Sequence, residues 1–223
     1  MKKRSLLVLP VLAAANAAVA QDVIEDNRTW LNLNATGKIS KDWSWYGELQ
    51  PRFRDNSSES DQLLFRVAAI QKISPRLSLG YGYGSITNYR PAGDIHENRL
   101  WQMVTYNPPA RGPVTPNLRL RAEQRMVDGG SDVGWRLRLQ ARASRPIEGT
   151  KWSVFAGNEY FYNLNSTDWG ALQGFDQNRL FLGLGYQVSK QAKFEFGYMN
   201  QYVRGASADR KNHVLFFTTV LSF

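Results

Sequence analysis

The segment from Leu118 to Ala143 alternates apolar and polar residues almost without interruption, in the order LRLRAEQRMVDGGSDVGWRLRLQARA. Successive side chains of a β-strand point to opposite faces, so this segment is predicted to form a hairpin with one apolar and one charged face. Its turn falls at residues 128–132. Each predicted strand has roughly 10 to 12 residues, about twice the average in soluble proteins. Long strands with two such faces are typical of a wall between two solvents.

The first twenty residues have the three parts of a secretory signal peptide. Lys2, Lys3 and Arg4 form a basic start, residues 6–15 are apolar, and residues 18–20 read Ala-Val-Ala, a small-residue cleavage site. We therefore expect residues 1–20 to be removed on export and residues 21–223 to form one domain. Without them the formal charge falls from +9 to +6, because 25 Lys and Arg remain against 19 Asp and Glu. The absence of cysteine excludes disulfides.

Eleven segments alternate in this way, and no useful helical periodicity follows residue 20. They span residues 28–38, 43–53, 62–73, 77–89, 97–107, 117–127, 134–145, 152–162, 177–188, 193–202 and 212–223. Short turns and longer polar loops alternate between them, as at the periplasmic and extracellular ends of bacterial outer-membrane barrels. Such barrels have even strand numbers, so residues 22–27 would form a further short strand or enter the lumen, or one segment is not a strand. We predict a transmembrane antiparallel up-and-down β-barrel of 10 to 12 strands.

Aromatic residues gather near the predicted strand ends, where a membrane barrel places its two aromatic girdles. Those towards the short turns are Trp43, Trp45, Trp152, Tyr186, Phe194 and Phe223. Those towards the long loops are Phe53, Tyr89, Trp135, Tyr160, Tyr162 and Tyr202. The segment 212–223 also alternates up to a final Phe, like the terminal strand that the barrel-assembly machinery recognises in outer-membrane proteins. These features predict the bacterial outer membrane as the location.

If lipid covers the apolar face, the charged face points into the barrel, because an Arg in lipid at mid-depth costs about 2 to 4 kcal/mol. The residues predicted to line the lumen are Glu48, Arg52, Arg66, Arg99, Arg119, Arg121, Glu123, Arg125, Arg136, Arg138, Arg142, Glu159, Arg179 and Glu195, with Glu97 beside them. Tight turns would pair Glu123 with Arg138, Arg138 with Glu159, Glu48 with Arg66 and Glu159 with Arg179. The interior is thus predicted to carry a band of crossed Arg–Glu pairs.

Two functions fit such an interior. Paired charges could fill a structural barrel, or an excess of arginine could leave a narrow pore that favours anions. An enzyme with a site at the extracellular rim is an alternative, since His96 lies beside Glu97 and near Asp94, and His213 is the second histidine. Neither histidine has the serine or Asp pair expected of barrel deacylases or omptin proteases, so no catalytic residue is predicted. A soluble periplasmic β-sandwich binding protein is the remaining alternative.

No zinc-ligand spacing, phosphate loop or nucleotide fingerprint is present, so neither a metal nor a cofactor is predicted. The glycines of residues 80–84 alternate with tyrosines, which indicates a strand. Predicted partners are outer-membrane lipids and lipopolysaccharide, the assembly machinery through the strand that ends at Phe223, and a small anionic solute. Nucleic acid is not expected, because the arginines occupy barrel-interior positions.

Several strings go beyond simple alternation and resemble those of a known family. They are RTWL from Arg28, WSWYGELQPRF from Trp43, HENRLWQ from His96, LRLRAEQR from Leu118, NEYF from Asn158 and GFDQNRLFLGLGY from Gly174. Their order resembles the domain-of-unknown-function 2490 family of bacterial outer-membrane barrels over nearly the whole chain after the signal peptide. The resemblance implies the barrel fold and an outer-membrane location. It implies no established activity or catalytic residues.

Overall fold

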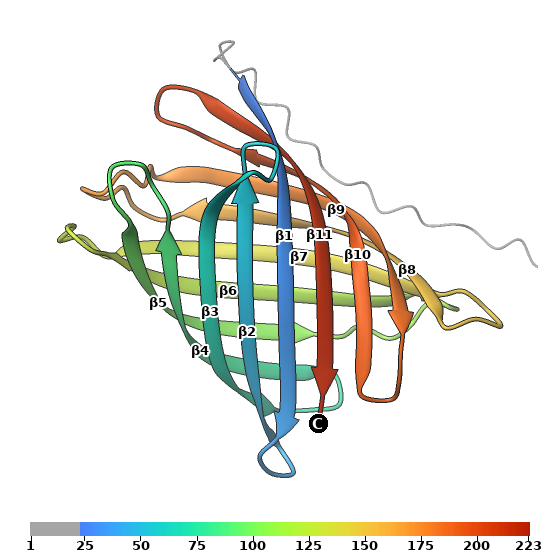
Figure 1. Ribbon diagram of the computed structural model, residues 1–223. Helices are drawn as coiled ribbons and strands as arrows, with labels where there is room; N and C mark the ends of the chain where they lie inside the picture. The colour runs from blue at the N-terminus through green and yellow to red at the C-terminus, as the bar shows by residue number, and fades with distance from the viewer. Residues whose placement is uncertain (1–22) are drawn as a thin grey trace, which may run out of the picture.

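The computed structural model describes residues 23–223, which form eleven β-strands closed into a barrel (Figure 1). The predicted signal peptide lies outside the described residues. The strands are β1 (Val23–Lys38), β2 (Trp43–Arg54), β3 (Glu59–Lys72), β4 (Leu77–Asn88), β5 (Ile95–Tyr106), β6 (Thr115–Val127), β7 (Gly134–Pro146), β8 (Trp152–Asn163), β9 (Gly174–Gln187), β10 (Ala192–Val203) and β11 (Asp209–Ser222). Each corresponds to one predicted segment. Residues 23–223 contain no helix long and apolar enough to span a membrane.

Each strand pairs antiparallel with the next along the chain, and β1 pairs with β11 to close the barrel. This closing pair is parallel, from Val23 opposite Asp209 to Thr36 opposite Ser222. With an odd number of alternating strands, the first and last must run in the same direction. The predicted all-β barrel of 10 to 12 strands is confirmed, and its one departure from antiparallel pairing is this seam. Closure also excludes the β-sandwich alternative.

Residues 23–27 form neither a separate strand nor a segment in the lumen. They are the first part of β1 and continue its pairing with β11. The strand number is therefore eleven, and all eleven predicted segments are strands. The extra residues let β1 extend beyond its antiparallel neighbour β2, whose pairing with β1 begins only at Thr29.

The two ends of the barrel differ in their connections (Figure 1). One end carries the turns 39–42, 73–76 and 188–191, the two longer connections 107–114 and 147–151, and the C-terminal end of β11. The other end carries the loops 55–58, 89–94, 128–133, 164–173 and 204–208. We call these the turn end and the loop end. The polar loops cluster as the sequence pattern predicts.

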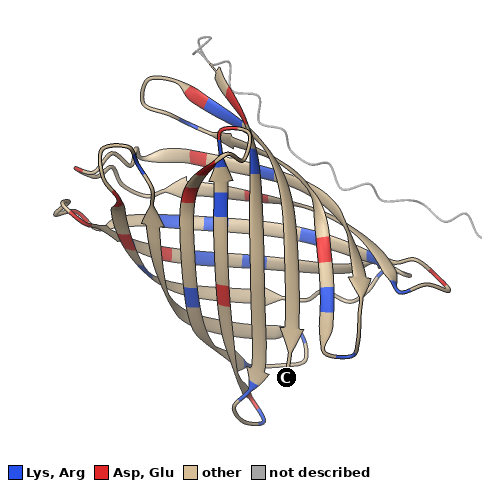
Figure 2. Cartoon of the chain, in the orientation of Figure 1, with Lys and Arg blue, Asp and Glu red and all other residues tan. Residues whose placement is uncertain are grey.

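The barrel wall is apolar outside and charged inside. Leu139 and Leu180, in the middle of their strands, point outward and are 56% and 57% exposed. Glu123, in the middle of β6, points inward and is 1% exposed. Figure 2 shows charged residues along the strands themselves and not only in the connections. A protein folded in water usually has the opposite distribution.

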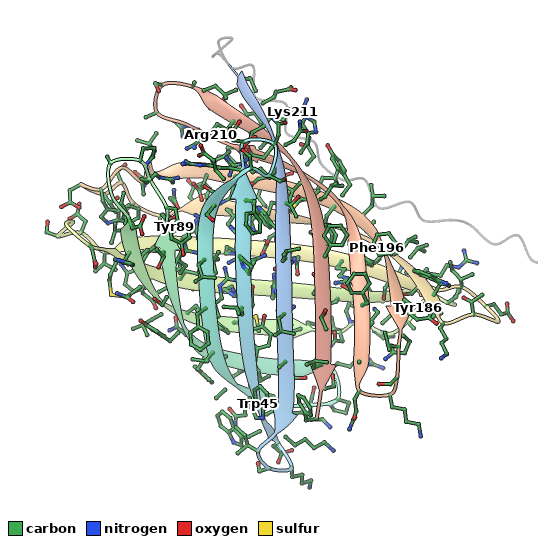
Figure 3. The ribbon with its side chains drawn as sticks, viewed as in Figure 1. Trp45, Tyr89, Tyr186, Phe196, Arg210 and Lys211 are labelled. Atoms are coloured by element: carbon green, nitrogen blue, oxygen red, sulfur yellow. The ribbon has the colours of Figure 1, made fainter. Side chains whose placement is uncertain are left out.

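Aromatic rings pack on one another near both ends of the outer surface. At the turn end, Trp45 stacks on Phe223 with ring centroids 6.3 Å apart, and Trp152 packs on Tyr186 at 4.8 Å. At the loop end, Phe175 lies between Tyr160 and Tyr202, at 5.2 and 6.0 Å. Figure 3 shows Trp45 and Tyr89 near opposite ends of the barrel. The outer wall is thus bordered by two aromatic zones.

Candidate functional site

Glu123 is the centre of an ion-pair network inside the barrel. Its Oε2 accepts a hydrogen bond from Arg136 Nη2 and its Oε1 one from Arg138 Nη1, both at 2.6 Å. Arg121 Nη1 lies 3.7 Å from the same carboxylate. Inward positions alternate along β6 and β7, so the hairpin brings all four side chains to one level. Three guanidinium groups therefore share one buried carboxylate.

Two further carboxylates are shared in the same way. Glu159 lies 2.7 Å from Arg138, 3.0 Å from Arg119 and 3.6 Å from Arg179. Glu97 accepts hydrogen bonds from Arg99 Nε and Arg125 Nε, each at 2.6 Å. Such charge-assisted bonds to guanidinium forks are among the stronger hydrogen bonds in proteins. Glu123 and Glu159 share Arg138 and join β6, β7, β8 and β9 in one network, whereas Glu97 joins β5 and β6 in a separate cluster.

The four predicted Arg–Glu contacts are present as ion pairs. Glu48 and Arg66 are direct cross-strand partners at 2.7 Å. Glu123 is directly opposite Arg136, and Arg138 reaches it diagonally. The register of the β6–β7 hairpin thus differs by two residues from the predicted one, while the contact is kept because arginine is long enough to reach the diagonal neighbour.

Arg52 on β2 has a different environment. No ion pair within the described part of the chain includes Arg52. Its Nη1 and Nη2 donate to the amide oxygens of Gln62 and Gln50, both at 2.7 Å. Its guanidinium carbon lies 3.7 Å from the ring centre of Trp30, and that of Arg179 lies 4.9 Å from the same ring. An aromatic ring and neutral amides surround this charge.

Four inward aromatic residues, which were not predicted from the sequence, pack against arginines. They are Trp30, Trp101, Phe155 and Phe161. A Cβ at Gly82 would collide with the ring of Trp101, so a residue without a side chain is needed there. The inward position of these rings could have been predicted from the sequence, because every second residue of a strand lies on the same face. Trp101, for example, is two residues from Arg99 and therefore on the same face of β5.

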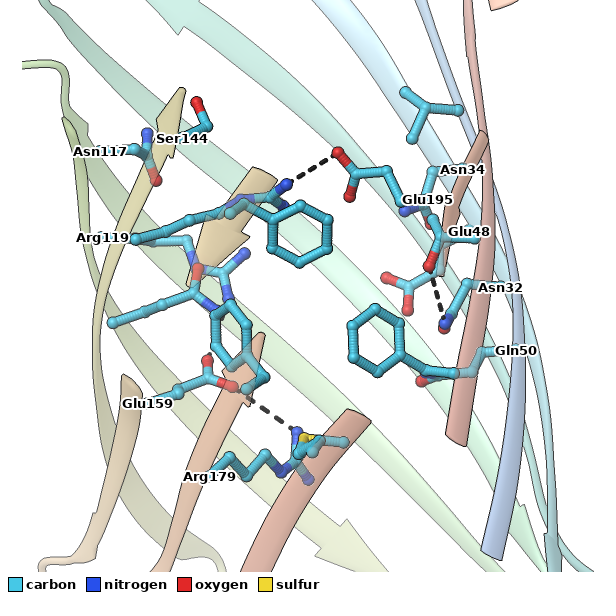
Figure 4. A pocket seen from close by; sticks show the side chains of 18 of the residues that line it. Asn32, Asn34, Glu48, Gln50, Asn117, Arg119, Ser144, Glu159, Arg179 and Glu195 are labelled. Atoms are coloured by element: carbon cyan, nitrogen blue, oxygen red, sulfur yellow. Dashed lines mark hydrogen bonds and ion pairs between the residues drawn. The ribbon is translucent and has the colours of Figure 1, made fainter. Parts of the chain in front are cut away.

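Two cavities lie in series in the lumen. The wide chamber, towards the turn end, has a volume of about 580 Å³, and the narrow chamber, towards the loop end, about 250 Å³. Figure 4 shows side chains of the wide chamber, with Glu159 and Arg179 facing one another. Five residues line both chambers and form what we call the waist: Trp30, Arg52, Arg66, Arg138 and Arg179.

Positive charge exceeds negative charge in both chambers. The narrow chamber is lined by ten arginines and three carboxylates. The wide chamber is lined by seven arginines, Lys193 and three glutamates. Six of these charged residues were not among those predicted to line the lumen: Arg28, Asp61, Arg90, Asp176, Lys193 and Arg210. The fourteen predicted residues all lie inward, thirteen of them on a chamber wall and Glu123 buried in the network.

The loops 128–133 and 164–173 are joined at the loop end by what we call the clasp, formed by Ser131, Asp132, Asp168 and Trp169. The backbone N–H and hydroxyl of Ser131 both donate to Asp168 Oδ2 at 2.8 Å. Asp168 N–H donates to Asp132 Oδ2 at 2.8 Å, and Trp169 Nε1 to Asp132 O at 2.9 Å. The hydrogen bonds, first that from the Ser131 backbone, hold the pKa of the Asp168 carboxyl below its usual range.

The clasp places an aromatic ring over the charged interior. The ring centre of Trp169 lies 4.9 Å from the guanidinium carbon of Arg125. A third cavity, of about 430 Å³, lies beneath the loop 164–173. Some of its lining residues also line the narrow chamber, among them Arg90, Arg125 and Asp176. The clasp therefore borders the opening of the lumen at the loop end.

The two histidines lie on the outer side of the wall near the loop end. His96 Nδ1 is 3.2 Å from Thr87 Oγ1, whereas Glu97 points inward and binds Arg99. Glu97 therefore does not orient His96, as the alternative of an enzyme at the rim would need, because adjacent strand residues face opposite sides. His213 Nδ1 lies 2.6 Å from Tyr198 Oη. Residues 23–223 contain no cluster of three His, Cys, Asp or Glu side chains that could hold a metal ion.

The residues that match known proteins cover almost the same part of the chain as the barrel. The family model described as Protein of unknown function (DUF2490) matches residues 27–212, which include part or all of each strand. An uncharacterized protein of Methylorubrum extorquens is 32% identical over 217 residues, covering 95% of this chain and 94% of the relative. No solved structure matches the chain. From the family match and this full-length similarity, we conclude that the chain belongs to the DUF2490 family.

Proposed function

We propose that this protein is a bacterial outer-membrane barrel whose lumen favours small anions. The distribution of apolar side chains supports the location, because outward leucines at mid-strand would contact acyl chains instead of water. A strand of 12 residues, the shortest length here, rises about 30 Å when tilted by about 40°. This matches the hydrocarbon thickness of a bilayer, about 30 Å. The export signal predicted at residues 1–20 supports the same location.

The excess of arginine in the two chambers is the observation that carries the preference for anions. Ten arginines and three carboxylates line the narrow chamber, and even with Glu48, Glu123 and Glu159, which pair with some of these arginines from outside its wall, positive charge remains in excess. A low-dielectric wall strengthens such a field, and rings of Arg or Lys select anions in pores. The waist places four arginines at the junction of the chambers, where a passing ion would have to lose part of its hydration.

A structural barrel that conducts little is the second candidate. Trp30 at the waist is 4% exposed, and the Glu123 network fills the interior beside it. Wide aqueous channels are found in barrels of about 16 strands, and this barrel has eleven. A small conductance, or none, would support this structural candidate.

Ion conduction by the refolded full chain in a planar bilayer tests the proposed pore. With a potassium chloride gradient across the bilayer, we expect a small conductance with a reversal potential that indicates chloride preference. Arg179→Gln, at the waist, should reduce this preference. Arg145→Gln is the matched control, because Arg145 is exposed on the outer side of β7. A cation preference would contradict the anion pore, and a folded barrel without conductance would favour the structural candidate.

The location is tested separately by membrane fractionation. The protein should require detergent for extraction and should migrate faster in a detergent gel before heating than after it. In the membrane, the outer wall would contact lipid and, at the loop end, lipopolysaccharide, while β11 would be the strand presented to the barrel-assembly machinery. Extraction in buffer alone would contradict the proposed location.

A further inference from the structure

The waist contains Arg52, a buried arginine that forms no ion pair with a carboxylate in residues 23–223. We propose that Trp30, Arg52 and Arg179 form a binding site for a small, multiply charged oxyanion, with inorganic phosphate as the probe. This inference rests on the anion-favouring lumen proposed above and adds a defined site and ligand class to it. Its test measures binding and does not require conduction.

Arg52 supplies the first part of the site. It is 7% exposed, and its two terminal nitrogens bind amide oxygens. Its Nε–H is buried and has no hydrogen-bond partner among the described residues. A buried N–H without an acceptor is costly, and an ionised acceptor compensates it better than a neutral one. Arg52 therefore keeps both a charge and a donor for a ligand.

Trp30 supplies a second donor beside the first. Its indole Nε1–H is also buried without a partner in residues 23–223, and the side chain is 4% exposed. The Arg52 guanidinium lies on its ring at 3.7 Å. Both side chains line both chambers, so a ligand could reach them from either side of the waist. Two neighbouring N–H groups without acceptors favour a ligand with several acceptor oxygens.

Arg179 adds a second positive charge at the same ring. Its Nη1 lies 3.6 Å from Glu159, a longer separation than that of the other two arginines at this carboxylate. Its Nε donates to Gln177 Oε1 at 3.2 Å, which leaves the remaining donors of the fork. Guanidinium forks match the oxygen spacing of phosphate and carboxylate. Two such groups favour a divalent oxyanion over chloride.

A second Trp–Arg stack in the barrel provides a matched control. Arg121 lies over Trp101 at 4.2 Å, and the Nε–H of Arg121 and the indole N–H of Trp101 also lack partners in the described chain. In contrast to Arg52, Arg121 has Glu123 within 3.7 Å, and although Arg121 lines the wide chamber, Trp101 lines neither chamber. The two stacks consist of the same side chains. They differ in whether a carboxylate neutralises the arginine and in whether the tryptophan lines a chamber.

Isothermal titration calorimetry of the refolded full chain in detergent micelles tests the site. Phosphate is titrated at pH 7 and constant ionic strength, and we expect saturable binding at one site that sulfate competes for and chloride does not. Arg52→Gln and Trp30→Phe should each weaken binding about tenfold or more, because each removes a donor to a charged acceptor. Trp101→Phe should leave binding unchanged. Heat-modifiable gel migration confirms that each variant is folded.

The failure of this site and the failure of the pore are distinguishable. Absence of saturable phosphate binding in a folded barrel, or equal binding by Arg52→Gln, would overturn the site even if the pore prefers anions. Heat of the same size from chloride would overturn it as well, since only nonspecific attraction would remain. Phosphate binding that requires Arg52, in a barrel that does not conduct, would uphold the site and overturn the pore.

Discussion

Arg52 at the waist and the arginines that bind Glu123 are the same kind of buried side chain in different surroundings. In the network, Arg136 and Arg138 each lie 2.6 Å from a carboxylate that is almost completely buried. At the waist, Arg52 is equally buried, but its neighbours are Trp30 and two amide oxygens. The difference lies in whether the protein supplies the counter-charge.

This contrast separates two uses of arginine within one wall. An arginine held by two carboxylates, as Arg138 is, cannot bind a solute without breaking bonds that join β6, β7 and β8. An arginine held by amides can accept an anion without losing its own partners. The number of arginines in a lumen is therefore a poor guide to ligand binding, and the number without carboxylates is a better one.

The largest expected effect is on the network. Glu123→Gln leaves three buried guanidinium groups with one carboxylate fewer, and breaking a buried pair in this way costs about 3 to 5 kcal/mol. We expect the free energy of unfolding, measured by urea titration in micelles, to fall by this amount. Glu25→Gln is the control, because its pair with Lys211 is exposed and should contribute little. If both variants lost the same free energy of unfolding, the buried network would contribute no more to stability than an exposed ion pair.

The next effect tests the outer side of the same wall. Leu139→Arg places a charge at mid-strand on the outward face, which costs about 2 to 4 kcal/mol if lipid covers that face. Ile147→Arg, in the connection after β7, should cost about 0 to 1 kcal/mol because it lies near the bilayer surface. Unfolding in phospholipid vesicles measures both. Equal and small losses would show that no lipid covers Leu139.

A smaller effect is expected at the waist. Arg52→Gln removes a charge that has no carboxylate partner, so the free energy of unfolding should change by no more than about 1 kcal/mol. The variant should instead lose stabilisation by phosphate. A ligand at a hundredfold excess over its dissociation constant stabilises the native state by about 2.7 kcal/mol. Thermal unfolding with and without phosphate should show this gain in the natural chain only.

The smallest effect is expected at the clasp. Asp168→Asn weakens the bonds from Ser131, so the Ser131 amide should exchange hydrogen faster while the β6 and β7 amides stay protected. The pKa of Asp168 is lower in the folded protein, so its contribution to stability is complete above the unfolded value of about 3.9 and is lost as pH falls through the folded value. Protection of Ser131, corrected for intrinsic exchange, should fall only below about pH 4. Loss at pH 6 would contradict this assignment.

The strands could be predicted because alternation is strong in long two-faced segments. The inward position of Arg138 and the outward position of Leu139 both follow from it, and so do the ion pairs between neighbouring strands. The same alternation also predicts that the side chains of Trp30 and Trp101 point inward. Those rings were missed because aromatic residues were expected only in the outer girdles.

Other features depend on how the barrel closes and could not be read from the sequence. The stagger between strands decides that Arg136 is opposite Glu123 and that Arg138 reaches it diagonally. The same stagger brings Arg179 of β9 to the ring of Trp30 on β1. The absence of a carboxylate beside Arg52 is likewise a property of the assembled interior. The parallel seam follows from the strand number, which the sequence left at 10 to 12.

The seam between β1 and β11 also has a consequence for how the barrel folds. Every other pairing joins strands that are adjacent in the chain, whereas the seam joins residues as far apart as Asn32 and Thr218. Contacts between distant residues form slowly, because the intervening chain must first be ordered. We therefore expect a curved sheet of hairpins to form first and closure to be the late step of folding. Until that step, β1 and β11 have unpaired edges, and the waist, to which β1 contributes Trp30, is incomplete.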